Sequence, residues 1–488
     1  MKHIAFDLGG SGGKMALGEL KNGKLSFQEI YRFPNRQISL RGDLMWDVLG
    51  IYQHLLEGIR LACQQEQDVC SVGMDSFCND FGILDPRGTL MSQVHCYRDS
   101  RAERCQDYVY SRIPKAELHK LTGNQNALFN TIMQLGALRA DGKDGYFAPG
   151  NTLLLLPDLL GYFLTGCKRT EYSNASVTQL FSPYVGNWSE EILNKLGVPR
   201  DLLTDIILPG TVLGAVSEDV CSEVNAKKLD VVAVCSHDTA SAVAALPTND
   251  PNTAFISSGT WSLVGTEIDA PITNEQTFVG NFAVEGGAEK RSRLLKNVMG
   301  LWLVQECKYS FERKGQNYSH AQLVELAQQA QPFRSLIDPD APAFYMPGHM
   351  PEKIADFCRS TGQPVPETPG QFIRCIMESL ALKYRWSVES LASISGKRLD
   401  TIHILGGGGQ NLLLNQFTAN ACGRKVLVGP TEAALCGNLL MQLKAYGEID
   451  SLAQGRQILA DSFPLTQYLP QDAEQWDCQY ERFLTLLV

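Results

Sequence analysis

The sequence lacks the patterns that define several common protein classes. Its 488 residues include 14 cysteines, but no pair has C-x-x-C spacing and no H-E-x-x-H occurs. A zinc site and a thioredoxin-type redox site are therefore not supported, and most cysteines are interpreted as small apolar core residues. The longest apolar segment, Leu153–Leu164, contains Pro157 and Asp158 and is too short to span a bilayer.

Positive charge is also scarce. The 43 Lys and Arg residues are outnumbered by 53 Asp and Glu residues, which gives a net charge of −10. This balance disfavours binding to nucleic acid or to an anionic membrane surface, because both reward dense basic faces. The short apolar run Ile4–Phe6 does not form a signal peptide. We expect a cytoplasmic protein with no nucleic-acid or membrane partner, and the sequence does not decide between a monomer and a dimer.

Two nucleotide-binding fingerprints are absent as well. The glycine-rich stretch 8–14 is not a Walker A motif, because Leu8 stands in place of its first glycine and Met15 in place of its Ser or Thr. No G-x-G-x-x-G hexamer occurs in the chain, which argues against a dinucleotide-dependent oxidoreductase.

What is present is an alternation of β-rich runs and helical patterns, which predicts an α/β fold. A chain of this length also predicts two large domains. The expected strands are 3–6, 71–74, 231–235, 254–256 and 401–405. The expected helices are 46–64, 128–140, 371–393 and 411–421, and the break Thr368-Pro369-Gly370 opens the third of them.

Two segments half a chain apart share the pattern of strand, small-residue turn and strand. The first spans 4–18 around Gly9-Gly10-Ser11-Gly12-Gly13, and the second spans 254–265 around Ser258-Gly259-Thr260. In both turns glycine is expected to permit positive φ angles and close approach of a ligand to the backbone. The repeat favours two related halves, domain 1–244 and domain 245–488, near a break in the pattern at 247–252.

Three segments have residues suited to phosphate chemistry. The first turn can direct N–H groups at a phosphate oxygen while Asp7 holds Mg²⁺ through water, although a plain glycine hairpin is the alternative. In Ser236-His237-Asp238-Thr239, Asp238 can accept the proton of a hydroxyl that attacks a γ-phosphate. The alternative is that Ser236 or Asp238 caps the following helix. The glycines 406–409, with Gln410 and Asn411, can lie against a planar ring or form a structural turn.

Together these residues resemble the FGGY carbohydrate kinases of the actin-like ATPase superfamily, over nearly the whole chain. The resemblance is carried by Tyr97-Arg98-Asp99-Ser100-Arg101 and by the stretches 236–243, 257–263, 285–289, 295–303 and 406–411. Within that family the chain is most similar to members that phosphorylate L-rhamnulose. The resemblance implies two actin-like, ribonuclease H-like domains with a cleft for ATP and sugar between them.

The resemblance also implies a reaction and the residues that perform it. ATP, with Mg²⁺ near Asp7 and Asp238, would phosphorylate the ketose to give L-rhamnulose 1-phosphate and ADP, and Asp238 would be the general base. The ketose would be bound by His237, Thr239 and Asn297. The nucleotide would be contacted by Gly10, Ser11, Gly12, Gly13, Lys14, Thr260, Gln305, Gly407 and Gly408.

One stretch departs from the family pattern in the candidate sugar site. The L-rhamnulose-phosphorylating members usually have Thr-Trp-Gly-Val-Asp-Phe where this chain has Ser76-Phe77-Cys78-Asn79-Asp80-Phe81, so Cys78 replaces a sugar-contacting glycine. A Cβ and a thiol there would intrude on a pocket shaped for backbone approach. L-fuculose, another deoxyketose or a pentulose is therefore an alternative substrate. A sugar- and ATP-binding sensor is the non-enzyme alternative, against which the presence of Asp238 argues.

Overall fold

The computed structural model describes residues 1–487, which fold into two compact units. The first unit contains Met1–Asn249, Ile268–Leu294 and Ala433–Phe463, and the second contains most of the remaining chain. The chain thus returns to the first unit near its C-terminus. The linear boundary expected after residue 244 stays a prediction.

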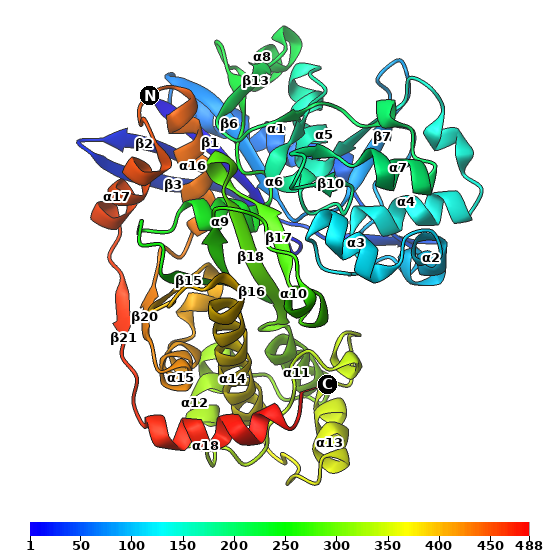
Figure 1. The fold of residues 1–488 in the computed structure, drawn as a ribbon. Helices are drawn as coiled ribbons and strands as arrows, with labels where there is room; N and C mark the ends of the chain where they lie inside the picture. The colour runs from blue at the N-terminus through cyan, green and yellow to red at the C-terminus, as the bar shows by residue number, and fades with distance from the viewer. Residues whose placement is uncertain (488) are drawn as a thin grey trace. The chain divides into compact units, whose positions relative to one another are not determined.

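A six-stranded sheet forms the centre of the first unit, in the order β13-β14-β6-β1-β2-β3 (Figure 1). β1 pairs antiparallel with β2 and parallel with β6, and β6 pairs parallel with β14. The carboxyl ends of β1, β6 and β14 therefore meet at one edge of the sheet. The bounds are β1 (Lys2–Leu8), β2 (Gly12–Lys21), β3 (Lys24–Pro34), β6 (Val69–Ser76), β13 (Thr211–Ala215) and β14 (Asp230–Ala233).

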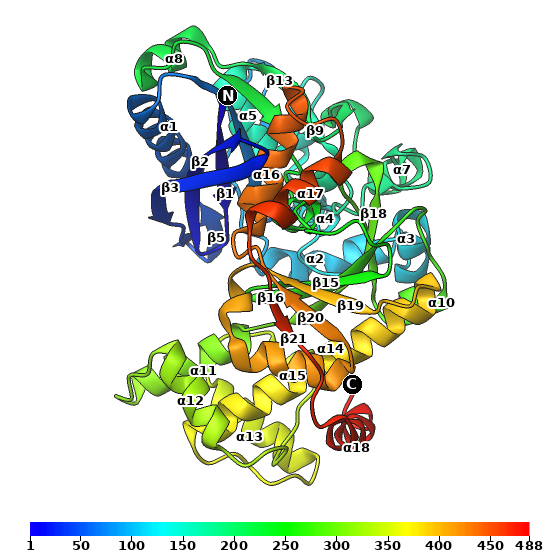
Figure 2. The same ribbon diagram turned by 90° about the vertical axis from the view of Figure 1, so that its left-hand side faces the viewer.

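Helices α1 (Val48–Gln65), α9 (Asp238–Ala244) and α16 (Ala433–Ala445) pack around this sheet. Figures 1 and 2 both show α16, in orange, beside the blue strands of the N-terminus. Close packing of α16 on α9 requires glycine at 437, because a methyl group there would lie 1.8 Å from the carbonyl oxygen of Ser241. Gln442 also donates a hydrogen bond to the carbonyl of Ile4 at 2.9 Å. Helix α16, from the C-terminal part of the chain, thus packs against α9, the helix that begins with Asp238.

A second apolar core of the first unit lies outside the main sheet. It is built around the antiparallel pair β7 (Phe81–Leu84) and β8 (Thr152–Leu155) and the helices α2 (Arg101–Tyr110), α4 (Thr131–Ala140) and α7 (Glu190–Leu196). Leu135, Leu155 and Ile192 are completely buried in it. The residue that follows β8 holds the loop 77–80 after β6, because Leu156 donates a backbone hydrogen bond to the carbonyl of Asp80 at 2.9 Å.

The second unit is also built on a mixed sheet, whose seven strands have the order β17-β18-β16-β15-β19-β20-β21. The first of these strands, β17 (Ala283–Gly286), belongs to the first unit by residue assignment. β15 pairs antiparallel with β16 and parallel with β19, and β19 pairs parallel with β20. Helix α14 (Pro369–Ser395) and helix α15 (Leu412–Cys422) pack against each other in this unit. The strand bounds are β15 (Thr253–Ser258), β16 (Trp261–Ile268), β18 (Ser292–Met299), β19 (Thr401–Leu405), β20 (Lys425–Val428) and β21 (Thr466–Tyr468).

Most of the expected elements are present, with shifted ends. The α/β fold, both hairpins and the helix start at Thr368-Pro369 are confirmed, because the Thr368 hydroxyl accepts a hydrogen bond from the Gln371 N–H and Pro369 is the first helical residue. The strand expected over 231–235 ends at Ala233, and the helix expected over 128–140 begins at Thr131. The helix expected from Trp46 begins at Val48, because Trp46 ends the strand β5 (Asp43–Trp46).

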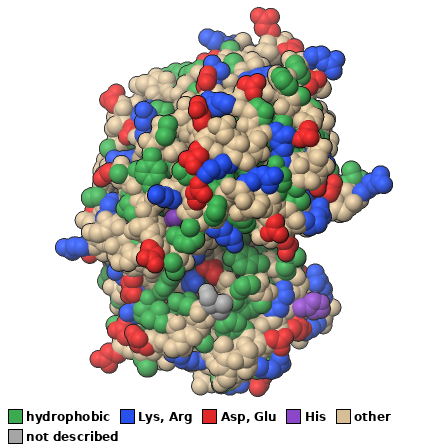
Figure 3. Space-filling view, turned by 45° about the vertical axis from the view of Figure 1, so that its right-hand side comes forward, with side chains coloured by type: hydrophobic (Ala, Val, Ile, Leu, Met, Phe, Trp, Pro, Cys, Tyr) green, Lys and Arg blue, Asp and Glu red, His purple; other side chains and the backbone are tan. Residues whose placement is uncertain are grey.

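Within residues 1–487, no helix combines the length and the apolar character that crossing a membrane would require. Figure 3 shows Lys and Arg side chains interspersed with Asp and Glu side chains over one face of the molecule.

Candidate active site

Three carboxylates gather at the strand ends of the first unit. Asp7 stands directly opposite Asp75 in the β1–β6 ladder. The β14–α9 loop is fastened to the same edge, since Ser76 donates a backbone hydrogen bond to the carbonyl of Ser236 at 2.9 Å. This places Asp238 beside the other two carboxylates. Burial and the charge of Asp7 raise the pKa of Asp75 well above its usual value.

Asp238 is the first residue of α9, and the cap of that helix is His237, whose side chain makes no capping hydrogen bond. The interpretation of Ser236 or Asp238 as the N-cap is therefore wrong. The Ser236 hydroxyl instead donates to Glu171 at 2.7 Å. Oδ1 of Asp238 accepts hydrogen bonds from the N–H and the hydroxyl of Thr239, at 2.6 and 3.2 Å. These contacts fix the orientation of the Asp238 carboxylate.

The electrostatic surroundings of Asp238 suit a general base. Its side chain is one-third exposed, 33%. Desolvation, with the negative charge of Asp7 as the next cause, raises the pKa of Asp238 to about 7. A carboxylate whose pKa lies near neutrality is ionised often enough to accept a proton and basic enough to hold it.

Glu171 holds the backbone of the Asp238 loop and was not anticipated from the sequence. Its carboxylate accepts hydrogen bonds from the N–H of Ser236 at 3.0 Å and from the Ser236 hydroxyl, and also from the N–H and hydroxyl of Ser173. The Ser173 oxygen in turn accepts the N–H of His237 at 3.2 Å. The one signal in the sequence was an acidic residue shortly before Ser173 and Asn174, a pattern that can mark a helix start. In the structure, Glu171 caps the short helix α6 (Tyr172–Ala175).

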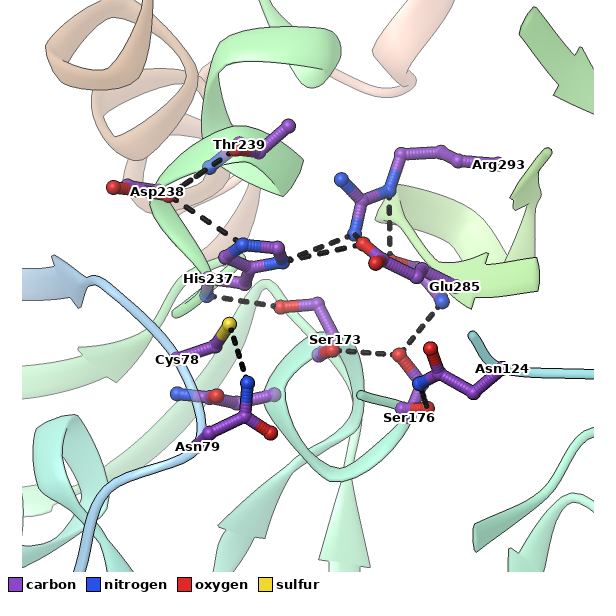
Figure 4. A network of polar contacts seen from close by, with 12 residues as sticks. Cys78, Asn79, Asn124, Ser173, Ser176, His237, Asp238, Thr239, Glu285 and Arg293 are labelled. Atoms are coloured by element: carbon purple, nitrogen blue, oxygen red, sulfur yellow. Dashed lines mark hydrogen bonds and ion pairs between the residues drawn. The ribbon is translucent and has the colours of Figure 1, made fainter. Parts of the chain in front are cut away.

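A buried polar row lies behind Asp238 (Figure 4). His237 faces Asp238 on one side and the pair of Glu285 and Arg293 on the other. Burial and the neighbouring guanidinium of Arg293 hold the pKa of His237 well below its usual value, so the ring is neutral. Glu285 lies on β17 (Ala283–Gly286), within a stretch that contributed to the family resemblance, but no site role was assigned to either Glu285 or Arg293.

Cys78 lies in the loop that follows β6. Its sulfur accepts a hydrogen bond from the side-chain amide of Asn79 at 3.1 Å, and Asn79 has a left-handed φ of 78°. Burial, with the negative charges of Glu285 and Asp238, raises the pKa of the Cys78 thiol well above its usual value. The thiol therefore stays protonated and adds an apolar, bulky group near the row of Figure 4.

In the first glycine turn, packing explains the choice of glycine at some positions but not at every position. None of Gly9, Gly10, Gly12 and Gly13 has a positive φ, nor does Gly259 in the second turn, so that expectation is wrong. A methyl group at Gly13 would instead come within 2.3 Å of the Phe33 ring, and one at Gly12 within 3.0 Å of the Phe33 carbonyl.

Gly10 has a looser environment than these two glycines. A methyl group there would lie 3.5 Å from the Tyr97 hydroxyl, which is an ordinary contact. Packing thus does not explain Gly10, and Ser11 is exposed beside it. Lys14 lies at the far end of the turn, with its ammonium 3.2 Å from Asp7.

The predicted nucleotide residues of the second unit lie on adjoining backbone segments. Leu301 and Trp302 donate backbone hydrogen bonds to the carbonyls of Gly259 and Thr260, at 3.1 Å each. Gln305 follows one turn later on α11 (Trp302–Arg313), and its amide donates to the Tyr309 hydroxyl. The second turn is thus joined to the helix that carries Gln305.

The four glycines 406–409 also differ from one another. Gly406 has a φ of 83°, and methyl groups at Gly408 and Gly409 would collide with Ser258 and Val428. Gly407 alone of the four would tolerate a methyl group, since nothing lies within 4 Å of it. Asn411 caps α15 through its side-chain oxygen, which accepts from Leu414 N–H at 3.1 Å. A structural reason therefore exists for three of the four glycines, and Gly407 is the one left for a ligand.

Asn297 is the remaining predicted ketose residue. It lies on the part of β18 that belongs to the second unit. Its buried Oδ1 has no hydrogen-bond partner among residues 1–487. A buried amide oxygen without a partner is costly in a folded protein, which is a reason to expect a ligand there.

Comparisons with known proteins identify the family. Residues 3–245 match the N-terminal domain model of the FGGY family of carbohydrate kinases, and residues 254–446 match its C-terminal domain model. The chain belongs to the FGGY family of carbohydrate kinases. It is therefore a sugar kinase, an enzyme that transfers phosphate from ATP.

Individual relatives cover nearly the full length. The chain is 40% identical to a rhamnulokinase of Bacteroides thetaiotaomicron over 480 residues, 98% of each chain. It is 36% identical to a rhamnulokinase of Bacillus subtilis, covering 97% of this chain and 96% of the relative. A gluconate kinase structure from Lactobacillus acidophilus matches the fold at 16% identity with a TM-score of 0.81, covering 99% of this chain and 96% of that chain. The two-domain actin-like fold is confirmed.

Proposed function

We propose that this enzyme phosphorylates L-rhamnulose with ATP, giving L-rhamnulose 1-phosphate and ADP. The observation that carries the proposal is the 36–40% identity to curated rhamnulokinases over almost the entire chain. The orientation and raised pKa of Asp238 support the chemistry. A ketose hydroxyl is a weak nucleophile, so a base must be aligned with it.

Asp238 is the general base in this proposal. The hydroxyl oxygen on C1 of the ketose forms a bond to the γ-phosphorus of ATP, and the bond between that phosphorus and the β,γ-bridging oxygen breaks. The hydroxyl proton passes to the Asp238 carboxylate, and the electron pair of the broken bond leaves with ADP. Removal of such a base typically slows a reaction by about 10²–10⁴-fold.

In this proposal, backbone N–H groups and the Lys14 ammonium bind the phosphates of ATP. The turn Gly10–Gly13 presents N–H groups, and Thr260 adds a hydroxyl from the second turn. Lys14 brings positive charge to a region that otherwise holds Asp7, Asp75 and Asp238. Gln305, Gly407 and Gly408 are assigned to the adenosine by the family resemblance, and the open space at the Gly407 backbone supports this for Gly407.

The acidic residues fit a divalent cation. Burial is the largest cause of the raised pKa of both Asp75 and Asp238, and the negative charge of Asp7 is the next, so the three carboxylates lie close enough to repel one another. The described residues contain no cluster of three or more His, Cys, Asp or Glu side chains arranged to hold a metal ion. By the family resemblance, Asp7 and Asp238 would hold Mg²⁺ through its water shell. Bound Mg²⁺ supplies charge neutralisation for the phosphates.

The ketose is assigned to His237, Thr239, Asn297 and the loop at Cys78. Asn297 offers an amide oxygen that lacks a partner, and Cys78 contributes a protonated thiol near Asp238. Cys78 is the observation that favours a second candidate, another ketose such as L-fuculose or a pentulose. An added side chain in place of glycine changes the space available to a substrate methyl or hydroxyl group.

A substrate panel tests the proposal. Release of ADP is measured with L-rhamnulose, L-fuculose, L-ribulose and D-xylulose, and L-rhamnulose is expected to have the highest kcat/KM. If another ketose has the highest value, the substrate assignment is wrong while the kinase assignment stands. Binding of ketose and ATP without turnover of any ketose would support the sensor alternative.

Variants at Cys78 separate the two candidate substrates. Cys78→Gly restores the backbone of the usual pattern, and Cys78→Ala retains the Cβ without the thiol. If Cys78 shapes the pocket, the ratio of kcat/KM values between ketoses shifts in both variants, and more in the glycine variant. An unchanged ratio in both would remove Cys78 from the specificity site.

A further inference from the structure

Three buried side chains from three elements stand in a row behind Asp238 (Figure 4). His237 comes from the start of α9, Arg293 from the first residues of β18 and Glu285 from β17. The exposed fractions are 4% for His237, 0% for Arg293 and 3% for Glu285. All three belong to the first unit. Such a row is costly to bury, which suggests that it is retained for a purpose.

Arg293 is held rigidly beside the His237 ring. Its Nε and Nη2 both donate to the carbonyl of Gly286, at 3.1 and 2.8 Å, and Nη2 lies 3.1 Å from Oε2 of Glu285. Nη2 also lies 3.3 Å from Nδ1 of His237, within hydrogen-bond distance. The guanidinium cannot lose its protons, so at this contact it is always the donor.

The contact with Arg293 decides where the proton of His237 resides. Nδ1 lies 3.5 Å from Oε2 of Glu285, an oxygen that has no hydrogen-bond partner among residues 1–487, and 3.3 Å from Nη2 of Arg293. Because the Arg293 N–H is the group within hydrogen-bond distance of Nδ1, we infer that Nδ1 is its acceptor. The ring proton is then on Nε2. Nε2 lies 3.5 Å from Oδ1 of Asp238, so its N–H faces a carboxylate.

We propose that Arg293 is a positioning residue for phosphoryl transfer. It fixes His237 as the tautomer with the proton on Nε2, so that an N–H faces Oδ1 of Asp238, the oxygen that already accepts two hydrogen bonds from Thr239. Oδ2 is thereby the oxygen that faces the ketose hydroxyl and takes its proton. The inference rests on the proposed function, in which Asp238 is the base, and it gives His237 a role toward that base in place of a ketose contact through its ring nitrogens.

Nuclear magnetic resonance of ¹⁵N-histidine protein tests the tautomer without any substrate. The His237 signal is assigned by its loss in His237→Gln. We expect the wild type to show His237 as a neutral ring protonated on Nε2, and Arg293→Met to show a mixture of both tautomers. A wild-type ring protonated on Nδ1, or an unchanged tautomer in Arg293→Met, overturns the proposal.

Kinetics test the consequence for catalysis, with whichever ketose the wild type phosphorylates best. Arg293→Met is expected to lower kcat about 10–100-fold, the range found for residues that orient a functional group. The KM for the ketose is expected to change much less. Arg293→Lys keeps one donor and is expected to recover part of the loss.

Arg456 offers a matched control. It is also buried, 2% exposed, and it donates hydrogen bonds to the carbonyls of Val243 and Ala244 at the other end of α9. Arg456→Met therefore removes a buried arginine from the same helix without touching His237. An equal fall of kcat in Arg456→Met would show that the effect is only structural and would overturn the proposal.

A double variant links the two residues. Glutamine at 237 carries an N–H near the position of Nε2 and has no tautomers. Arg293→Met is therefore expected to cost much less in the His237→Gln background than alone. Equal costs in both backgrounds contradict the proposal. Failure of the wild type to phosphorylate any ketose would instead defeat the proposed function and leave the tautomer result to decide this inference.

Discussion

The two sheets are alike in topology and unlike in the residues at their strand ends. The six strands of the first sheet have the order β3-β2-β1-β6-β14-β13, and the strands β18-β16-β15-β19-β20-β21 of the second have the matching order, with β17 as an additional strand beside β18. At matching positions, Asp7 stands opposite Asp75 in the first sheet, whereas Ser257 stands opposite Leu405 in the second. The difference teaches that one scaffold serves two tasks, since ligands bind at strand ends while the strands behind them carry the fold.

The glycines show the same division. In the first turn, Gly12 and Gly13 let β2 pack against Phe33, whereas the carboxylates beside the turn carry the proposed chemistry. In the second unit, the strand ends are neutral, and Gly407 leaves an open backbone. We infer that the first unit supplies the acid–base group and that the second supplies a neutral surface for the nucleotide.

The largest expected effect is the loss of kcat in Asp238→Asn, which tests whether the acidic strand ends of the first unit carry the chemistry. The variant keeps the size of the side chain but removes its basic oxygen, so kcat should fall about 10²–10⁴-fold. The measurement is the rate of ADP release at saturating substrates, with ATP affinity measured by calorimetry as the check on folding.

The matched control in the second unit is Glu432, an acidic residue in the loop that follows β20, as Asp238 follows β14 in the first unit. Glu432→Gln should lower kcat less than threefold by the same assay, an order-of-magnitude limit for a residue outside the chemistry. If Asp238→Asn retains most of the activity, or if both variants lose it equally, the acidic strand ends are not what distinguishes the units.

The second-largest expected effect is on the Mg²⁺ concentration that the enzyme requires. Asp7→Asn removes one of the two carboxylates assigned to the Mg²⁺ water shell, so the Mg²⁺ concentration for half-maximal activity should rise about tenfold. Ser257→Ala, at the matching place in β15, should leave this concentration unchanged. A Mg²⁺ titration of activity in each variant gives the answer, and equal shifts would contradict the assignment.

A third pair of variants separates structural from functional glycines. In Gly13→Ala the new methyl group would lie 2.3 Å from the Phe33 ring, so unfolding should become easier by about 3 kcal/mol. In Gly407→Ala the methyl group meets no atom within 4 Å. Stability should then be unchanged while the KM for ATP rises.

Denaturant unfolding and ATP kinetics measure the two variants side by side. A stable Gly13→Ala protein would mean that Phe33 can move aside. A Gly407→Ala protein with normal ATP kinetics would mean that the nucleotide does not use this backbone.

The sequence predicted the parts of the site that depend on local order. Asp238 follows an apolar strand, and Asp7 precedes a glycine turn, so both could be proposed from neighbouring residues alone. The repeated hairpins likewise indicated two related halves, and the two sheets show that relationship. Helix starts such as Thr368 were accessible because a cap is a local hydrogen bond.

The residues that were missed act over long separations. Glu171 reaches Ser236 across 65 positions, and Arg293 reaches His237 across 56. Asn438 of α16 donates to Asp75 from 363 positions away. No periodicity or spacing reveals such pairs, because only tertiary packing brings them together. The positive φ expected of the turn glycines failed for a related reason, since packing against Phe33 selected glycine at 12 and 13.

The smallest expected effect is a pH response of opposite sign at two buried groups, one in each unit. In the first unit, burial and Arg101 lower the pKa of His95 from 6.5 to about 4. The unfolded chain then binds a proton before the folded one as pH falls, so stability is lost between pH 6.5 and 4. His95→Gln should remove this loss, of order 2 kcal/mol.

In the second unit, burial raises the pKa of Glu378 from 4.5 to about 7, against the opposing charge of Arg374. Here the unfolded chain loses its proton first as pH rises, so stability is lost between pH 4.5 and 7. Glu378→Gln should remove that loss. Hydrogen exchange at pH 5 and pH 7, followed separately for peptides of each unit, measures both effects. One contrary result is that both variants alter the stability of the same unit, and another is that both shift stability in the same direction with pH. Either result would mean that burial of His95 and Glu378 does not set the pH dependence of stability. The contrast between the units would then be confined to their strand ends.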